Sequence, residues 1–449
     1  MNLAGKIAAI VVVVLVAAAG VGWLILHTRG PTSFAGGTPV ALADYHGPNP
    51  TGVPADLSHA DLLKRGEYLA RAGDCAACHN APGGEPYAGG YAFKLPFGTI
   101  YSSNITPDKE TGIGNWSDAD FLKAMHDGIR KDGENLYPAF PYTSYTLLTD
   151  ADVLAIKAYL FSLKPVHYQP PANTLGFPFN QRFLMKFWNV LFNPGRRFEP
   201  NSDRPPEWNR GAYLTEALGH CGDCHTPRNL MFGLSESQKF AGALTAGWKA
   251  YNITPDREWG IGAWSDDQLA DYLAGGHAPG RSSAAGGMGE AVDNSLRFLT
   301  AGDVRDMIAY VKSVPPIADS SDPAAVRTPL EPPHPAPLTI SGGSPSLGLQ
   351  VFEGACASCH GFDGSGTVWP QADLVGTRTV NDPTAVNLTQ VVIQGASLHT
   401  PYGQVFMPAF GQAYSDGEIA AVANYVTGRF GSAASHITAA DVAKIRRGD

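Results

Sequence analysis

One five-residue pattern that can do chemistry, Cys-x-x-Cys-His, occurs three times in the chain, at 75–79, 221–225 and 356–360. It is the attachment signature of c-type haem: two thiols bond covalently to the porphyrin, and the adjacent histidine binds the iron. The three copies use all six cysteines. We therefore predict three covalently bound haem c groups. Their thiols are Cys75 and Cys78, Cys221 and Cys224, and Cys356 and Cys359, and their iron ligands are His79, His225 and His360.

Two other uses of such cysteines have to be weighed. A structural zinc site needs a second pair of ligands at short range, and a disulfide framework needs a small, cysteine-dense module. Neither pattern is present in the sequence. Three intact copies with no cysteine left over favour haem attachment.

The opposite face of each iron needs a second ligand, which in electron-transfer cytochromes is usually a methionine that raises the reduction potential. Met288 and Met407 stand in Gly- or Pro-containing segments that we expect to be loops before the last helix of their domains. We predict them as the ligands of the second and third irons. At the matching position of the first domain stands Phe140, which cannot bind iron. For the first haem, Met125, His126 and no protein ligand all stay open.

Each motif needs a helix that leads into it. Helical spacing of apolar residues precedes Cys75 over 58–69, and 208–214 resembles it before the second motif. Further helical patterns at 150–163, 301–314 and 415–430 end each domain. The sequence thus predicts a mostly α fold, with one N-terminal transmembrane helix and three tandem cytochrome c domains joined by Pro-rich linkers. The expected ranges are a membrane anchor at 1–30, domains at 58–164, 205–315 and 346–432, an aromatic linker at 165–204 and a Pro-rich linker at 316–345.

The anchor is expected from the run Ile7–Leu26, which has no charged residue and is long enough to cross a bilayer as a helix. A cleaved signal peptide is the alternative, and we favour a retained anchor. Haem is attached to such motifs on the outer side of the bacterial inner membrane. The expected location is therefore the inner membrane, with the haem domains facing the periplasm.

The first two domains repeat internally. Asn-Ile-Thr-Pro-Asp occurs at 104–108 and 252–256, and a Trp-Ser-Asp segment follows in both copies. The segment 175–192 is dense in aromatic residues; it is either a helix packed between haem domains or a surface for a partner subunit or the bilayer. The net charge of −9 and the lack of a Lys/Arg cluster argue against a nucleic-acid partner.

The three haem motifs, the repeated Asn-Ile-Thr-Pro-Asp segments, Leu136–Ala139 and Met407–Phe410 resemble the triheme cytochrome c subunits of membrane-bound periplasmic dehydrogenases of acetic acid bacteria and their relatives. The resemblance implies electron transfer from a catalytic dehydrogenase subunit to ubiquinone in the membrane. The implied partner is a quinoprotein, a flavoprotein or a molybdopterin dehydrogenase. Phe140 departs from the usual Pro-Ala-Met-Pro-Tyr and resembles the cytochromes that accompany molybdopterin dehydrogenases with an iron–sulfur subunit. An aldehyde dehydrogenase complex is therefore favoured.

No residue pattern here calls for acid–base chemistry on an organic substrate, and the main hypothesis is a non-catalytic electron-transfer subunit. One alternative is the cytochrome subunit of an alcohol or sugar-acid dehydrogenase. Two others are a haem enzyme that acts on peroxide or nitrite at the first haem, and a cytochrome subunit of a terminal oxidase.

Overall fold

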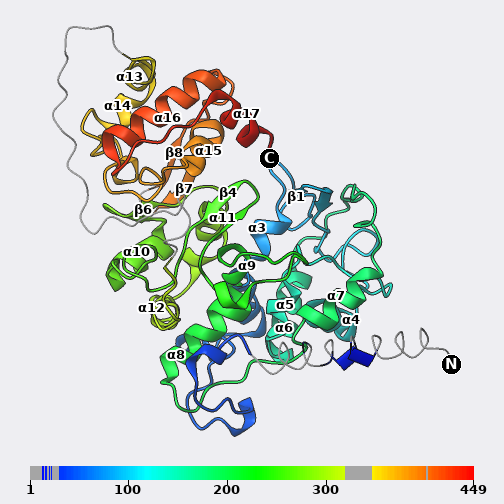
Figure 1. Ribbon diagram of the computed structural model, residues 1–449. Coiled ribbons are helices and arrows are strands. Elements are labelled where there is room, and N and C mark those ends of the chain that lie inside the picture. The colour runs from blue at the N-terminus through cyan, green and yellow to red at the C-terminus, as the bar shows by residue number, and fades with distance from the viewer. Residues whose placement is uncertain are drawn as a thin grey trace, which may run out of the picture.

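A computed structural model describes residues 13, 14, 16, 17, 20, 22, 30–318, 346–400 and 403–448 of the chain. The described residues form three successive helical units with small hairpins, each containing one Cys-x-x-Cys-His segment (Figure 1). The first unit contains α2 (Leu62–Ala72), α3 (Cys75–His79), β1 (Ala92–Leu95), β2 (Gly98–Tyr101), α4 (Asp118–Asp127), α5 (Tyr142–Tyr145) and α6 (Asp150–Ser162).

The second unit repeats this order with insertions, after the linker helix α7 (Leu184–Phe192). Its elements are α8 (Pro206–Ala212), the π-helix η4 (Tyr213–Leu218), α9 (Gly222–His225), β3 (Ala243–Thr245), β4 (Trp248–Ala250), α10 (Asp266–Gly275), β5 (His277–Ala278), β6 (Ser282–Ser283), α11 (Gly286–Asn294) and α12 (Ala301–Val311). The third unit contains α13 (Leu347–Val351), the π-helix η7 (Phe352–Cys356), α14 (Ala357–His360), α15 (Val386–Gln394), β7 (Ala396–Thr400), β8 (Gly403–Met407), α16 (Asp416–Phe430) and α17 (Ala439–Arg447).

In every unit the helix before the haem motif crosses the closing helix at a glycine. A Cβ on Gly66 would lie 2.0 Å from the carbonyl oxygen of Ala155, and one on Gly211 would lie 1.9 Å from that of Asp306. In the third unit the corresponding distance, from Gly348 to Ala421, is 2.3 Å. Such a close approach leaves no room for any side chain. The glycine therefore fixes the crossing of α2 on α6, α8 on α12 and α13 on α16, and with it the position of the motif that follows.

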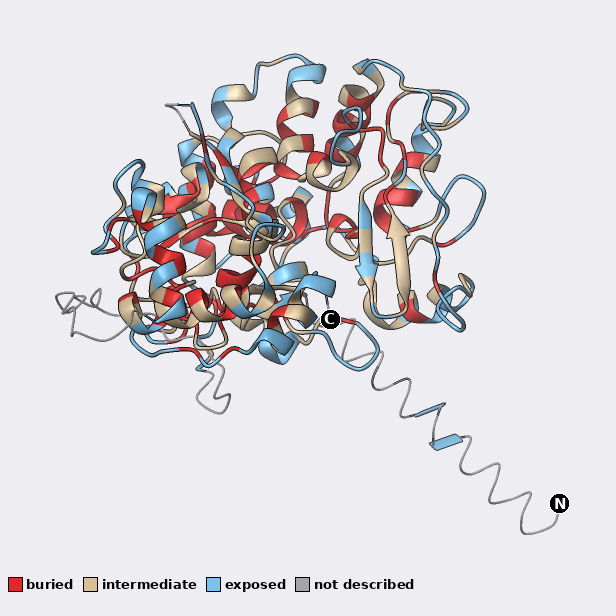
Figure 2. Ribbon diagram, turned by 90° about the horizontal axis from the view of Figure 1, so that it is seen from above, coloured by how far each residue is buried: buried red, intermediate tan, exposed pale blue. Residues whose placement is uncertain are grey.

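The described residues form three hydrophobic cores, of which the smallest, with Ile261, Trp264 and Val304, lies within the second unit. One core runs through the first two units and takes in Leu398 and Val405 from the β7–β8 hairpin of the third. The second core belongs to the third unit and includes Val442 of α17, a helix that the sequence analysis assigned to no domain. Figure 2 shows buried residues in the interior of the chain and exposed residues along its outer loops. The first two units thus form one packed body, and the third docks on it through its hairpin, through α15 and through Arg378, whose Nη1 donates to the carbonyl oxygen of Asn252.

The fold-class prediction needs two corrections. Helices make up 43 % of the structure, so the chain is not mostly α: long irregular segments and four two-stranded antiparallel sheets share the described part with them. The predicted N-terminal transmembrane helix is corrected as well. Within the described ranges no helix combines the length and the apolar character needed to cross a bilayer, and most of Ile7–Leu26 lies outside them. Twenty uncharged residues in a row satisfied a length criterion, and that criterion alone does not establish a spanning helix.

The segment that follows, from Gly30 to Leu57, packs across the first two units. Phe34 contacts the rings of Trp208 and Tyr310, at centroid distances of 6.4 and 5.9 Å. Backbone carbonyls of this segment also accept hydrogen bonds from Arg210 of α8. These contacts tie the beginning of the described chain to the second unit.

Candidate haem sites

The structure presents the three motifs in the form that haem attachment requires. None of the six cysteines is in a disulfide, and each motif histidine ends a short helix that also carries the second cysteine. Burial raises the pKa of the thiols of Cys75 and Cys221 to about 12, so they are protonated at neutral pH. Among the described residues, no group of three or more His, Cys, Asp or Glu side chains could hold a metal ion. The two thiols and the histidine of each motif thus stand close together along the chain, as haem attachment requires.

Each of the three motif histidines makes the same kind of hydrogen bond, from Nδ1 to a backbone carbonyl oxygen. Nδ1 of His79 lies 2.7 Å from the carbonyl oxygen of Ser103, and Nδ1 of His225 lies 2.7 Å from that of Tyr251. In the third motif, Nδ1 of His360 lies 2.6 Å from the carbonyl oxygen of Ala372. A carbonyl oxygen can only accept, so each Nδ1 carries the proton and each Nε2 keeps its lone pair. Iron-binding histidines show this pattern, because the second hydrogen bond fixes the tautomer and the ring orientation.

Burial lowers the pKa of all three motif histidines. Desolvation is the largest cause in each case, because a buried imidazolium loses its hydration. A lowered pKa keeps the ring neutral, as an iron ligand must be. The donor set and its protonation therefore fit haem iron at all three motifs.

The repeated Asn-Ile-Thr-Pro-Asp segment explains how two of these carbonyls are held. Ser103 directly precedes Asn104, and Tyr251 directly precedes Asn252. The Oδ1 atom of Asn104 accepts hydrogen bonds from the backbone N–H and the hydroxyl of Thr106, at 2.9 and 2.7 Å. Its Nδ2 donates to the carbonyl oxygen of Val166 at 2.8 Å. The asparagine thus joins the strand beside the histidine to the chain that leaves α6.

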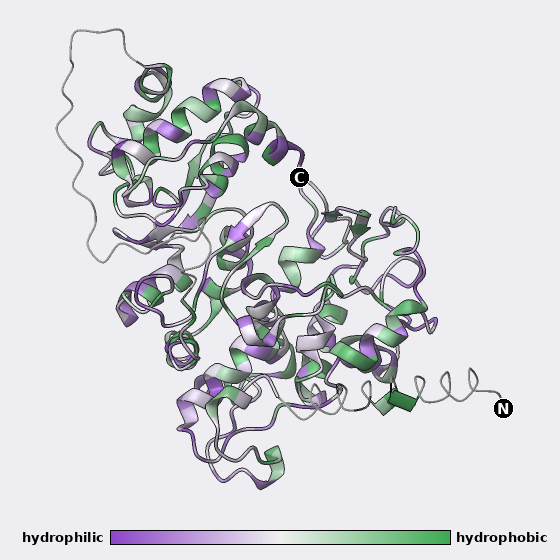
Figure 3. Cartoon of the chain, viewed as in Figure 1, coloured by the Kyte–Doolittle hydropathy of each residue, from purple (hydrophilic) through white to green (hydrophobic). Residues whose placement is uncertain are grey.

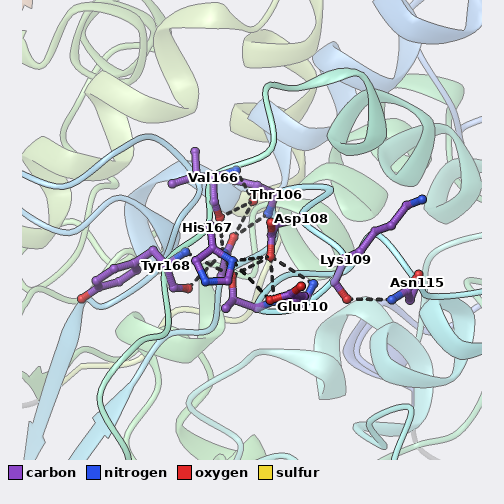
Figure 4. Close-up of polar contacts among 10 residues, drawn as sticks. Thr106, Asp108, Lys109, Glu110, Asn115, Val166, His167 and Tyr168 are labelled. Carbon is purple, nitrogen blue, oxygen red and sulfur yellow. Dashed lines mark hydrogen bonds and ion pairs between the residues drawn. The ribbon is translucent and has the colours of Figure 1, made fainter.

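The rest of this turn closes around Asp108 (Figure 4). Its carboxylate accepts hydrogen bonds from the backbone N–H and the hydroxyl of Thr111 at 2.7 and 2.8 Å, and these bonds lower the pKa of Asp108. In the second unit Asn252 and Thr254 make the corresponding bonds to Ile317. The repeat is therefore a structural clamp, and the residue before it supplies the histidine's partner. The sequence analysis found the repeat and missed this role, although its occurrence after both the first and the second motif was the available signal.

The predicted methionine ligands of the second and third irons lie in different structural settings. Met288 is in the first turn of α11 and not in a loop as expected, while Met407 ends strand β8, where it is paired with Ala396. Helix α11 packs on β4, the strand that precedes Tyr251. A Cβ on Gly286 would lie 2.3 Å from the Trp248 ring. The segment that carries Met288 is therefore close to β4 and so to Tyr251, whose carbonyl oxygen faces His225. Iron binding by Met288 and Met407 stays a prediction.

In the first unit, Tyr145 connects Phe140 to the backbone just before the haem motif. Its ring lies 5.4 Å from that of Tyr145, and the Tyr145 hydroxyl donates to the carbonyl oxygen of Gly73 at 2.6 Å, two residues before Cys75. Met125 is buried in the core shared with the second unit. Nδ1 of His126 lies 2.5 Å from Nη2 of Arg197. Because a guanidinium only donates, that nitrogen of His126 is an acceptor already in use.

Helix α11 is where the three units meet. It contacts α3, which is the first haem motif, and the hairpin strand β7 of the third unit. Asp293 on α11 accepts hydrogen bonds from the backbone N–H and from Nδ1 of His399, both at 2.9 Å. The segment with Met288 and the hairpin with Met407 are therefore parts of one contact region.

Two reciprocal hydrogen bonds join the first and second units. Tyr68 of α2 donates to Asp303 of α12 at 2.6 Å, and Tyr213 of the second unit donates to Asp152 of α6 at 2.5 Å. Arg210 also pairs with Asp303 through Nε and Nη2, at 2.8 and 2.7 Å. All five side chains are buried. This polar network fixes the relative position of the first two haem motifs, and the sequence analysis did not find it.

Comparison with known proteins agrees with this geometry. A family model described as cytochrome c matches residues 63–164, and one described as subunit III of cbb3-type cytochrome c oxidase matches residues 343–426. The chain is 38 % identical over 418 residues to the fructose dehydrogenase cytochrome subunit of Gluconobacter japonicus, covering 89 % of this chain and 85 % of that protein.

Two further relatives point the same way. The chain is 36 % identical over 413 residues to the gluconate 2-dehydrogenase cytochrome c subunit of Pantoea cypripedii, covering 87 % of this chain and 91 % of that protein. It is 41 % identical over 374 residues to one subunit of the nicotinate dehydrogenase of Pseudomonas putida, covering 83 % of this chain and 30 % of that longer protein. The chain therefore belongs to the family that its motifs predict, the cytochrome c subunits of bacterial dehydrogenases, and it carries covalently bound haem c.

Proposed function

We propose that this chain takes electrons from a catalytic dehydrogenase subunit and delivers them to ubiquinone through three haem c groups. The observation that carries the proposal is that His79, His225 and His360 each place Nδ1 against a backbone carbonyl oxygen, which leaves Nε2 free to bind iron. Bound haem iron supplies the one-electron redox step. The protein supplies the axial histidines, the six thiols and, under this proposal, Met288 and Met407 on the opposite faces.

The residues between the first two motifs support transfer within the chain. The ring of Tyr145 lies 5.6 Å from that of His220, the residue before Cys221, and the Tyr145 hydroxyl is bonded to Gly73. A few packed side chains thus separate the first motif from the second. The contact of α11 with both α3 and β7 brings the third unit near the same place.

For the catalytic partner we propose a molybdopterin aldehyde dehydrogenase with an iron–sulfur subunit. Phe140 in place of methionine supports this choice through the resemblance described above. The match to part of a longer nicotinate dehydrogenase subunit is consistent with a cytochrome that works in direct contact with a dehydrogenase. A quinoprotein or flavoprotein partner, as for an alcohol or sugar-acid dehydrogenase, is the alternative. The proposed location is the periplasmic side of the bacterial inner membrane, where c-type haem is attached.

Purification of the native complex in mild detergent tests the function and the partner together. The expected result is co-purification with a dehydrogenase subunit, molybdopterin and iron–sulfur clusters, and aldehyde-dependent reduction of a ubiquinone analogue. Pyrroloquinoline quinone or flavin would replace the aldehyde proposal by the alternative. Isolation of the chain with haem but without any dehydrogenase would contradict the main proposal.

A second candidate function rests on Phe140, which leaves the first iron without an assigned sixth ligand. An open iron there could act on peroxide or nitrite. The isolated haem-loaded chain would then show a high-spin signal that cyanide shifts, together with turnover of peroxide or nitrite. A fully low-spin spectrum without turnover would rule this candidate out.

A further inference from the structure

We propose that Arg378, a residue of the third unit, binds a propionate carboxylate of the second haem. The second haem is the one that Cys221 and Cys224 hold under the proposed function. The inference rests on that haem and goes beyond electron transfer as such, because it gives the second haem a binding residue from another unit.

The third unit is docked on the backbone that orients His225. Oδ1 of Asn387 on α15 accepts a hydrogen bond from the backbone N–H of Lys249 at 2.8 Å, and its Nδ2 donates to the carbonyl oxygen of Lys249 at 2.9 Å. Lys249 lies in β4, and both β4 and α15 mix hydrophilic with hydrophobic residues (Figure 3). Tyr251, directly after β4, places its carbonyl oxygen 2.7 Å from Nδ1 of His225. The contact between the units therefore lies beside the second haem motif.

Arg378 extends from the third unit into the second. Its backbone N–H donates to the carbonyl oxygen of Arg281 at 2.8 Å. In its side chain, Nη1 donates to the carbonyl oxygen of Asn252 at 3.0 Å, and Nη2 donates to that of Trp259. The guanidinium carbon lies 4.9 Å from the centre of the Tyr251 ring, and the residue is only 4 % exposed. These contacts hold the guanidinium inside the second unit, next to the residue that faces His225.

The charge of Arg378 is buried without a carboxylate in contact among the described residues. Burial lowers the pKa of its guanidinium to about 10, so the group is positively charged at neutral pH. Nε of Arg378 is buried and makes no hydrogen bond within the described part of the chain, and the carbonyl oxygens at Nη1 and Nη2 carry no net charge. A buried guanidinium without a counter-charge is unfavourable. The donors of Arg378 therefore fit a carboxylate that the described polypeptide does not supply.

Asp382 is the acidic residue nearest to Arg378 along the chain, and other groups hold its carboxylate. Oδ1 accepts hydrogen bonds from the backbone N–H and the hydroxyl of Thr384, at 2.9 and 2.6 Å. Oδ2 accepts a hydrogen bond from the hydroxyl of Tyr251 at 3.4 Å, and Nζ of Lys249 lies 3.8 Å from Oδ1. Asp382 thus forms its ion pair with Lys249 and not with Arg378.

The second haem brings carboxylates of the required kind. Haem c carries two propionates, and a guanidinium binds a carboxylate through directed N–H donors. The side-chain contacts of Arg378 are all with the second unit, around the segment that faces His225. His360 of the third motif faces a different segment, at Ala372. The geometry therefore favours the second haem over the third.

A second buried donor of this unit also makes no hydrogen bond among the described residues, namely Nε1 of Trp264. The Trp264 ring lies 5.6 Å from that of Tyr272. Burial raises the pKa of Tyr272 to about 12, and the charge of Arg378 opposes this rise. Two buried donors without partners are thus both near Tyr272, which supports an acceptor group from outside the polypeptide.

This contact gives the third unit an influence on the redox behaviour of the second haem. Reduction adds one electron, and a cation held against a propionate offsets the negative charge of that carboxylate. Arg378 should therefore raise the reduction potential of the second haem. The second haem site is then complete only when the third unit is docked.

The test uses the full haem-loaded chain with Arg378→Met, Arg378→Lys or Arg305→Met. Arg305→Met is the matched control, because Arg305 is an exposed arginine of the second unit and its loss changes the net charge equally. In an optical redox titration at a fixed potential, Arg378→Met should lower the ratio of reduced to oxidised second haem about tenfold, a shift of about 59 mV. Arg378→Lys keeps the charge and should shift this transition less, and Arg305→Met should leave all three transitions in place. The double variant Cys221→Ala, Cys224→Ala lacks the second haem, so the transition that it loses identifies that haem.

Infrared difference spectra between the oxidised and reduced chain report on the carboxylate itself. Cells supplied with δ-aminolevulinate that carries the heavy carbon isotope in its carboxyl group label the haem propionates. The labelled carboxylate band that changes with the second haem's transition should move in Arg378→Met and in Arg378→Lys, and it should stay in place in Arg305→Met. If Arg378→Met fails to hold three haems, Arg378→Lys decides, because lysine keeps the charge and lacks the Nε donor.

The proposal is wrong if Arg378→Met holds its haems and moves no transition, or moves only that of the third haem. It is also wrong if the labelled band is unchanged in both variants while the second potential falls, since Arg378 would then act only through the backbone around Tyr251. These outcomes leave the proposed electron transfer standing, because no readout involves the dehydrogenase or ubiquinone. A chain that carries no haem on Cys221 and Cys224 would overturn this proposal and the three-haem proposal together.

Discussion

Asn104→Ala should change both the stability of the first unit and the potential of its haem. Asn104 is 2 % exposed, and its removal leaves the buried N–H of Thr106 without its partner at 2.9 Å and takes from the carbonyl oxygen of Val166 the donor at 2.8 Å. A buried group left unsatisfied costs about 1–3 kcal/mol, so the free energy of unfolding should fall by about that amount. The backbone at Ser103, just after β2, would then loosen, and the hydrogen bond between its carbonyl oxygen and His79 would weaken.

A weaker bond to Nδ1 makes the imidazole a poorer electron donor, so the reduction potential of the first haem should rise. A difference of 1 kcal/mol between the oxidised and reduced states corresponds to about 40 mV for one electron. The assays are denaturant unfolding and an optical redox titration that resolves the three transitions. Asn252→Ala should shift a different transition.

Asn115→Ala is the matched control in the same turn, because Asn115 is exposed and its side chain makes one hydrogen bond, to the carbonyl oxygen of Lys109. It should leave stability and all three potentials close to their original values. If Asn104→Ala lowers stability but moves no potential, the asparagine holds the linker only. Our account of the repeat as support for the histidine would then be refuted.

The further predictions concern the ion pair of Asp303, the two candidate methionine ligands and His126. Asp303→Ala leaves the buried guanidinium of Arg210 without its carboxylate partner and should lower the free energy of unfolding by about 3–5 kcal/mol. Asp306→Asn on the same helix should not lower it at pH 7, because desolvation raises the pKa of Asp306 to about 6 and its ionised form is already unfavourable; thermal melts of both variants decide this. Met288→Ala and Met407→Ala should each lower one haem potential and weaken the sulfur-to-iron absorption band, and an unchanged spectrum would remove that residue from the ligand set. Desolvation and Arg197 lower the pKa of His126 from 6.5 to about 4, so the unfolded state binds more protons in that window and stability falls as pH drops from 6.5 towards 4. His126→Gln should flatten this part of a stability-versus-pH curve, and an equally steep curve would show that another group is responsible.

The haem motifs and the family could be predicted from sequence because they are local. The chemistry of Cys-x-x-Cys-His lies within five residues, and the helix leading into the first motif shows its own periodicity. The partners of the motif histidines were not predicted, because Ser103 and Tyr251 contribute only backbone carbonyls. A carbonyl group is present at every position and leaves no mark on composition. The sequence signal that does exist is the Asn-Ile-Thr-Pro-Asp segment, which directly follows Ser103 and Tyr251 in the first two units.

The contacts between units were harder to predict, for a different physical reason. Tyr68 and Asp303 are separated by 235 residues, and Tyr213 and Asp152 by 61. Both aspartates occupy the same place, three residues after the capping Thr149 or Thr300 of the closing helix. The exchange is therefore nearly symmetric, each unit giving one tyrosine to the other's helix. Insertions shift the spacing between equivalent residues along the two units, which hides this symmetry from a comparison at one offset.

The assignment of a sixth iron ligand depends on these contacts between units. Met288 belongs by sequence to the second unit, yet its helix α11 packs against α3 of the first and against β7 of the third. The β7–β8 hairpin in turn ends at Met407, and it is fixed to α11 through Asp293 and His399. A change at either methionine segment can therefore move its neighbour's segment as well. For this reason the spectra of Met288→Ala and Met407→Ala should be compared with that of Asp293→Asn, which disturbs the contact and leaves both sulfur atoms in place.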